Sequence, residues 1–145
     1  MQQRGTKSIA FRYIPHDIPT IDKLGLPQSL KEIILKVRGL FLITGPTGSG
    51  KSTTLAALIN HLNENVKRNI ITIEDPIEFL QRDIKSIIRQ RDIGDDTDSF
   101  SDALTNALRH DVDVIVLGEM RDFDTISTAI TAAETGHLVL GTLHT

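Results

Sequence analysis

The sequence lacks cysteine and tryptophan, and its only aromatic residues are five phenylalanines and one tyrosine. Without cysteine, neither disulfide bonds nor thiolate metal sites can form, which is compatible with a reducing compartment. So few aromatic side chains offer little surface on which the bases of a single-stranded nucleic acid could stack. We therefore expect no nucleic-acid partner.

The net charge is small, and long apolar runs are lacking. The 16 basic and 19 acidic residues leave a net charge of -3, which gives no overall positive field to hold DNA, RNA or an anionic membrane. No apolar stretch approaches 18 residues and the first five residues are polar, so the sequence predicts neither a membrane-spanning helix nor a signal peptide. We expect a cytoplasmic protein without direct membrane insertion, built as one domain.

Against this background the most specific feature is a glycine-rich octapeptide that matches G-x-x-x-x-G-K-[S/T]. It reads Gly45-Pro46-Thr47-Gly48-Ser49-Gly50-Lys51-Ser52, and Thr53 follows it. Glycines let the backbone curl so that successive N–H groups point inward and form a cradle for anionic phosphates. Lys51 adds a positive charge and Ser52 a hydroxyl, and both stand at the N-terminus of a predicted helix, where the helix dipole also attracts anions. The pattern predicts ATP and Mg²⁺ as cofactors.

A glycine-rich turn that merely joins a strand to a helix is the simpler alternative. The context disfavours it, because the octapeptide directly follows the apolar run 40–43. It also leads into residues 53–62, whose apolar positions Leu55, Leu58, Ile59 and Leu62 have helical spacing.

The rest of the chain alternates predicted strands and helices. Short apolar strands are expected at 40–43, 70–73, 114–117 and 138–140, and amphipathic helices around 100–108 and 126–133. Strands that are apolar on both faces belong in a covered parallel sheet, so the fold class is α/β with flanking helices. Residues 81–98 are charged, and we expect few strands there.

The N-terminal part has a different pattern. Residues 8–14 alternate as a half-buried strand does, and the prolines within 15–28 indicate a linker leaving an earlier module. A capping box, Ser29 to Glu32, predicts a helix that ends at Gly39.

Acidic residues follow two of the predicted strands. Glu74 and Asp75 come after 70–73, and Glu119 after 114–117. In open parallel sheets ligands bind beyond the carboxyl ends of the strands, where a carboxylate can hold Mg²⁺ or orient and deprotonate water. Each acid alone could equally be a solubilising or capping residue, and Asp124 is a plausible N-cap of the next helix.

Two histidines bracket the last predicted strand. His137 precedes it and His144 follows it. A lone histidine is usually a satisfied polar group, but as a pair beside a phosphate loop they are functional candidates. A zinc site is disfavoured, because zinc requires three or four convergent ligands.

Four segments together resemble a known family. They are Thr44–Thr54, Thr72–Glu78, Gly118–Asp122 and Ala133–Thr145. In this order they are similar to the Walker A, Asp-box, Walker B and His-box motifs of the type II/IV secretion ATPases, with the greatest likeness to the retraction ATPases of type IV pili.

The resemblance implies a P-loop NTPase with a RecA-like sheet, which forms a hexameric ring and docks on a pilus or secretion platform at the inner membrane. Residues 1–14 would end an N-terminal PAS-like domain, 15–28 would be the linker, and 29–145 would be an ATPase domain truncated before its last strands and helices. Lys51 and Ser52 would hold phosphates and Mg²⁺, Glu119 would be the catalytic carboxylate, Glu74 and Asp75 would assist water and metal, and His137 and His144 would sense the nucleotide.

Three other functions remain open from the residues alone. A phosphotransferase acting on a small acceptor would share the loop and the acidic strand ends, but it would need an acceptor pocket or lid. A nucleotide-binding fragment without turnover would also fit. A nucleic-acid translocase is disfavoured by the charge balance and the few aromatics.

Overall fold

The computed structural model describes residues 2–3, 6–7, 9 and 17–144. Strands β1 (Gln2–Gln3) and β2 (Thr6–Lys7) pair as a small antiparallel sheet. The remaining elements, in chain order, are α1 (Ser29–Ile33), β3 (Gly39–Gly45), α2 (Lys51–Asn65), β4 (Asn69–Glu74), β5 (Ile87–Asp92), α3 (Phe100–Ala107), β6 (Val114–Leu117), α4 (Phe123–Glu134) and β7 (Leu138–His144).

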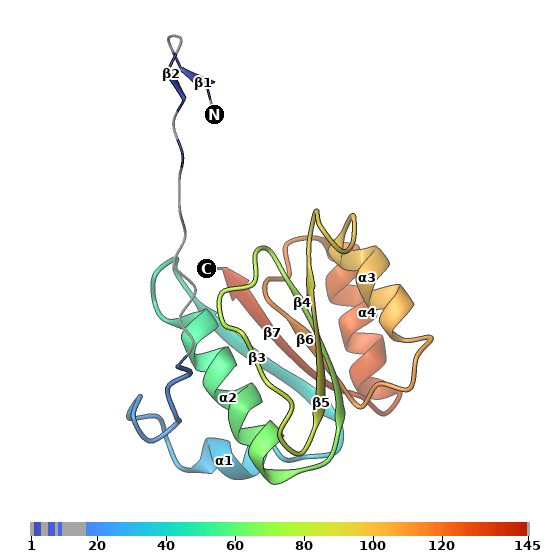
Figure 1. The fold of residues 1–145 in the computed structure, drawn as a ribbon. Helices are drawn as coiled ribbons and strands as arrows, with labels where there is room; N and C mark the ends of the chain where they lie inside the picture. Colours follow the sequence, from blue (N-terminus) through green and yellow to red (C-terminus); the bar gives the residue numbers. More distant parts are fainter. Residues whose placement is uncertain (1, 4–5, 8, 10–16, 145) are drawn as a thin grey trace.

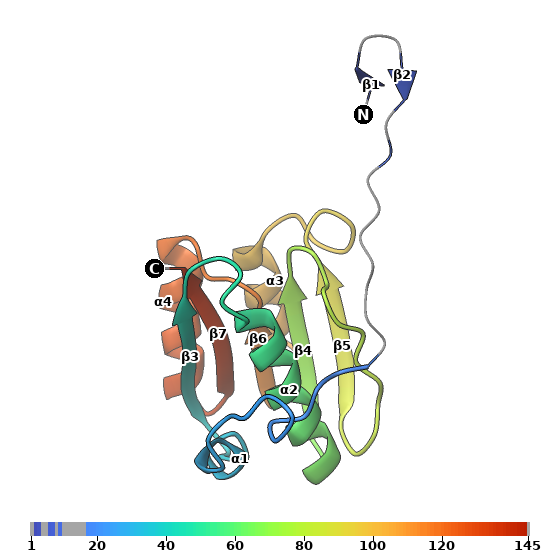
Figure 2. The same cartoon turned by 90° about the vertical axis from the view of Figure 1, so that its left-hand side faces the viewer.

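The larger sheet has five strands in the order β3-β7-β6-β4-β5, and every neighbouring pair is parallel. Helices α1 and α2 lie on one face and α3 and α4 on the other (Figures 1 and 2). The α/β class and the four apolar strands are thus confirmed. The expectation of few strands at 81–98 is wrong, because β5 forms the edge of the sheet.

The two faces of the sheet bury alternate residues of the same strands. On β6, Val114 and Val116 pack in the core beneath α2, whereas Ile115 and Leu117 pack beneath α3 and α4. All four side chains are fully buried. The continuous apolar run therefore reflects a central strand covered on both sides, as the period-2 geometry of strands requires.

The order of the strands follows from the crossovers. The chain leaves β3 through α2, enters β4 three positions away and continues to the edge strand β5. It then returns to β6 through α3 and to β7 through α4. Because crossovers between parallel strands are right-handed, movement in opposite directions puts the connecting helices on opposite faces. Because all five strands are parallel, their carboxyl ends share one edge, at the top of the sheet in Figure 1.

The long connection between β4 and β5 is attached to α2 by a buried asparagine. The Asn63 amide donates to the Arg82 carbonyl at 2.6 Å, and its oxygen accepts from the backbone N–H groups of Ile84 and Ser86, each at 3.1 Å. Asn63 is fully buried, so its amide satisfies backbone groups that would otherwise lose their hydrogen bonds. This connection carries the residues that follow Glu74.

Two of the expected elements belong to the N-terminal part of the chain. The strand predicted at 8–14 lies, apart from Ile9, outside the described residues. The predicted helix at 29–38 is shorter than expected: α1 ends at Ile33, its N-cap is Gln28 without a side-chain cap bond, and Gly39 instead begins β3. The predicted capping box does not form, because Ser29 lies inside the helix rather than before it.

Candidate active site

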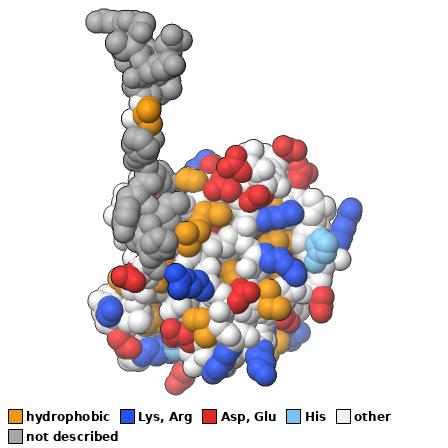
Figure 3. Space-filling view, in the orientation of Figure 1, with side chains coloured by type: hydrophobic (Ala, Val, Ile, Leu, Met, Phe, Trp, Pro, Cys, Tyr) orange, Lys and Arg blue, Asp and Glu red, His pale blue; other side chains and the backbone are white. Residues whose placement is uncertain are grey.

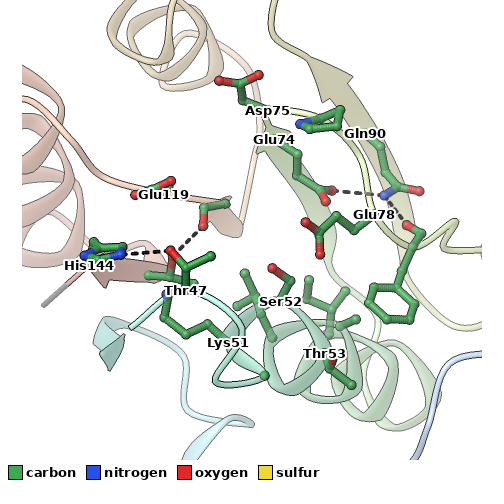
Figure 4. A pocket seen from close by; sticks show the side chains of 18 of the residues that line it. Thr47, Lys51, Ser52, Thr53, Glu74, Asp75, Glu78, Gln90, Glu119 and His144 are labelled. Carbon is green, nitrogen blue, oxygen red and sulfur yellow. Dashed lines mark hydrogen bonds between the residues drawn. The ribbon is translucent and has the colours of Figure 1, made fainter. Parts of the chain in front are cut away.

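A cavity of about 600 Å³ opens at the carboxyl edge of the sheet, above the start of α2. The phosphate loop supplies much of its wall, through Thr47, Gly48, Gly50, Lys51, Ser52 and Thr53. Facing it are residues from the ends of β4, β6 and β7, among them Glu74, Asp75, Glu119 and His144 (Figure 4). Segments far apart in the sequence meet here because parallel strands end at the same edge.

The phosphate loop has the backbone that its glycines permit. Gly50 is the N-cap of α2 with φ of 89°, a conformation that residues with a side chain rarely adopt. The Lys51 ammonium folds back over the loop and donates to the carbonyls of Gly45 and Pro46, at 2.8 and 3.0 Å. Ser49 closes the turn with a backbone bond to Pro46. The loop therefore holds a lysine charge directly above the positive end of a 15-residue helix.

Glu74 is a half-buried acidic residue of the cavity. Its Oε1 accepts from the Thr72 hydroxyl at 2.7 Å and from the Gln90 amide at 3.1 Å. Burial raises the pKa of this carboxyl above its ordinary value of 4.5, although its hydrogen bonds to Thr72, Gln90 and the Glu78 backbone oppose the change. Keeping Glu74 ionised in the folded protein therefore lowers the free energy of unfolding.

A Glu74→Gln variant should avoid this loss of stability. Between pH 4.5 and the raised value, the folded protein retains a proton that the unfolded chain releases, so the free energy of unfolding falls as pH rises through this window. Glutamine removes the charge and can still accept from Thr72 and Gln90. We expect urea unfolding to show the variant more stable at pH 7, by on the order of 1 kcal/mol, with the difference vanishing below pH 4.5.

The matched control is Glu64→Gln, on an exposed part of α2. It should leave the free energy of unfolding at pH 7 within about 0.5 kcal/mol of the wild type, as exposed substitutions usually do. A Glu74→Gln protein that is less stable than the wild type at pH 7 would mean that the ionised carboxylate stabilises the fold, contrary to this expectation.

Glu119 and Asp75 share one arginine. Arg121 donates to Glu119 Oε2 at 2.7 Å and lies 3.5 Å from Asp75 Oδ2. The hydrogen bond and charge of Arg121 lower the pKa of Glu119, so this carboxylate is ionised at neutral pH. The guanidinium, more than half exposed, lies where two acids from different strands converge. That is the kind of position in which a divalent cation could also be held.

The ends of β4 and β6 lie close together because residue 118, between β6 and Glu119, is a glycine. A side-chain carbon placed on Gly118 would lie 3.2 Å from the Glu74 Cα atom. A larger residue at 118 would therefore push the two strand ends apart.

The structure also corrects one expected cap: Asp122, not Asp124, caps α4, and its carboxylate accepts from the Thr125 N–H at 2.8 Å.

The two candidate histidines lie at opposite ends of β7. His144 lines the cavity, and its Nε2 is 2.9 Å from the Thr47 hydroxyl of the phosphate loop (Figure 4). His137 precedes the first residue of β7, and its Nδ1 lies 3.2 Å from the Ala132 carbonyl at the end of α4. The structure thus brings His144, but not His137, to the cavity, and a catalytic role for His137 stays a prediction.

The cavity also includes residues that the sequence did not single out, notably Phe79, Gln81, Gln90 and Arg121. Gln90 could have been found only by recognising β5 as a strand. Arg121 was part of the Walker B-like segment together with Glu119, but nothing local indicates its second acidic neighbour, Asp75. Among the described residues, no cluster of three or more His, Asp or Glu side chains is arranged to bind a metal by itself.

Comparison with known proteins bears on this geometry. Residues 6–145 match the family model described as "Type II/IV secretion system protein". The chain belongs to this family.

Several members of the type II/IV secretion family are similar to the chain over nearly its whole length. The type IV pilus retraction ATPase PilT of Pseudomonas aeruginosa is 54% identical over 144 residues, covering 99% of this chain and 42% of the relative. A crystal structure of the pilus retraction motor PilT with bound ADP superposes with a TM-score of 0.96 at 57% identity, covering 99% of this chain and 42% of that one. The structure of the Legionella pneumophila ATPase DotB gives a TM-score of 0.86 at 42% identity, covering 92% of this chain and 38% of that one.

The chain therefore spans about two fifths of the length of these relatives. No helix in the described part of the chain combines the length and apolar character that crossing a bilayer would need.

Proposed function

We propose that the chain is the nucleotide-binding part of an ATPase that drives a type IV pilus or secretion machine. The observation that carries this proposal is one cavity in which the Lys51 loop faces the carboxylates Glu74 and Glu119. Phosphoryl transfer to water requires chiefly positioning and charge stabilisation, and these groups can supply both.

The phosphates of ATP would lie against the backbone N–H groups of residues 47–53, with Lys51 exchanging its two loop carbonyls for phosphate oxygens. Mg²⁺ would be held by Ser52, Asp75 and Glu119, directly or through water. These three side chains suit Mg²⁺, because magnesium takes oxygen ligands and usually binds through one or two carboxylates together with the phosphates. When bound, it would neutralise charge on the phosphates.

Glu119 would accept the proton of the attacking water, since its carboxylate is ionised and lines the cavity. Glu74, on the neighbouring strand, would orient that water. His144 shares a hydrogen bond with Thr47 of the phosphate loop. A change in the conformation of the loop on binding or release of γ-phosphate would therefore be transmitted to the end of β7. The structure separates His137 from these groups, and its role in sensing the nucleotide depends on the family likeness alone.

Pilus retraction is the finer form of the proposal, and the 54% identity to PilT supports it. We infer a hexameric ring on an inner-membrane platform protein, located in the cytoplasm and peripheral to that membrane. Residues 1–14 would end a PAS-like domain, 15–28 would link it to the next domain, and 29–145 would form the ATPase domain.

Basic and acidic side chains are intermixed on the face seen in Figure 3, as suits a protein whose partner is not a nucleic acid.

The direct test is release of phosphate from ATP by the intact protein with Mg²⁺ and no acceptor. We expect ADP and phosphate in equal amounts, from the ring and not from the monomer. Turnover only after adding a small acceptor would instead indicate a phosphotransferase. Tight ATP binding without phosphate release would indicate a nucleotide-binding module, and an active monomer would contradict completion of the site by a neighbouring subunit.

A further inference from the structure

A glutamine on the edge strand contacts both Glu74 and the loop that follows it. Gln90, half-buried on β5, donates from Nε2 to Glu74 Oε1 at 3.1 Å and to the Phe79 carbonyl at 2.9 Å. Its Oε1 accepts from the Gln81 N–H at 2.8 Å. All polar atoms of this one amide are thus engaged by the acid and its loop (Figure 4).

The register of the sheet makes these contacts possible. Thr72 and Gln90 are partners across the β4–β5 ladder, and Glu74 is two residues beyond Thr72. Side chains of ladder partners, and of residues two apart on a strand, share one face of a sheet. Thr72 and Gln90 therefore approach the same oxygen of Glu74 from two strands.

Two donors from different strands restrict the carboxylate more than one could. The terminal torsion of a glutamate has a broad energy profile, and the other hydrogen bonds to this carboxylate come from buried Thr72 on β4 and from the Glu78 backbone in the connection that follows β4. The bond from Gln90 adds a fixed point on the neighbouring strand. Functional groups reach a productive geometry when neighbouring side chains fix them in this way.

The same glutamine also places the loop over the phosphate-binding helix. Phe79 and Gln81, which it binds through their backbones, both line the cavity. The Gln81 side chain then donates to the Ala56 carbonyl on α2 at 3.2 Å. Gln90 thus links the edge strand to the acid, and through the loop to the helix that begins at Lys51.

We propose that Gln90 is a positioning residue for ATP hydrolysis, which acts by orienting the Glu74 carboxylate toward the phosphate site. The proposal rests on the ATPase function proposed above. It predicts that the effect of losing Gln90 depends on the presence of the Glu74 carboxylate.

The test is a double-mutant cycle on the intact protein, with Gln90→Met, Glu74→Gln and the double variant. Methionine keeps the length of the side chain and removes its hydrogen bonds. We expect Gln90→Met to lower kcat about tenfold, as loss of a supporting hydrogen bond typically does, while ATP affinity stays the same. In the Glu74→Gln background the same substitution should change kcat by less than about twofold.

Two further variants test whether the loss of kcat in Gln90→Met is a purely structural effect. Gln90→Glu keeps the acceptor for the Gln81 N–H, and at a pH where both carboxylates are ionised it cannot donate to Glu74, so there it should lose at least as much kcat as Gln90→Met. Gln28→Met removes a similar amide-to-carboxylate bond, 2.7 Å long to Asp22, outside the cavity, and should keep the wild-type rate.

Equal losses from Gln90→Met with and without the Glu74 carboxylate would overturn the proposal, as would a normal kcat in Gln90→Met or Gln90→Glu. These outcomes would leave the ATPase function standing. A wild-type protein that releases no phosphate would overturn both.

Discussion

Replacing Lys51 with methionine or alanine is expected to abolish ATP binding at concentrations that saturate the wild-type protein. The ammonium lies 2.8 Å from the Gly45 carbonyl and 3.0 Å from the Pro46 carbonyl, at the N-terminus of α2, where it would meet the β- and γ-phosphates. Hydrogen bonds to charged groups contribute about 1.5–3 kcal/mol each, so losing two such bonds should raise the Kd more than about 100-fold.

The measurement is titration with a fluorescent ATP analogue in the presence of Mg²⁺. Lys51→Met keeps the apolar stem of the side chain, so a loss of binding there reports the charge. Lys67→Ala is the matched control, because Lys67 is exposed just beyond the opposite end of α2. Circular dichroism would check that the variants are folded. Binding by Lys51→Met within a few-fold of the wild type would remove the phosphate loop from the proposed site.

A Glu119→Gln protein should bind ATP normally and lose hydrolysis by about two or more orders of magnitude, the effect of a lost general base. Glutamine retains an oxygen that can accept from Arg121, which now lies 2.7 Å from Glu119 Oε2, so the local structure should persist. It cannot take a proton from water. The variant would therefore separate binding from chemistry at a residue that lines the cavity.

Phosphate release under saturating ATP gives the rate, and the same fluorescent titration gives the affinity. Glu64→Gln, on an exposed part of α2 outside the cavity, is the control and should keep the wild-type rate. Turnover by Glu119→Gln at the wild-type rate would exclude this residue as the base. Weakened ATP binding together with lost turnover would instead indicate that Glu119 acts chiefly through Mg²⁺.

The accuracy of the sequence predictions depended on whether each signal was local. The apolar strand at 114–117 could be predicted, because burial on both faces leaves no polar position in it. The cap of α3 is an equally local feature, since Ser99 and the N–H that it accepts from, that of Asp102, are three residues apart. The cap of α4 was misplaced by two residues, because both Asp122 and Asp124 have the right chemistry.

Strand β5 was missed for a physical reason. It pairs only with β4 and forms the edge of the sheet, where charged side chains are tolerated and protect against further pairing. Its sequence, Ile-Ile-Arg-Gln-Arg-Asp, therefore lacks the continuous apolar run by which the four other strands were recognised. Missing the strand also meant missing Gln90.

The sequence by itself determined the phosphate loop and the two-sided burial of the central strands, because glycine conformation and side-chain period are properties of neighbouring residues. Only the tertiary structure decided the strand order, the pairing of Thr72 with Gln90 beside Glu74, and which histidine reaches the cavity. These depend on hydrogen bonds and packing between segments far apart in the chain. No local pattern encodes which strands become neighbours, so the contacts around Glu74 exist only once the sheet has formed.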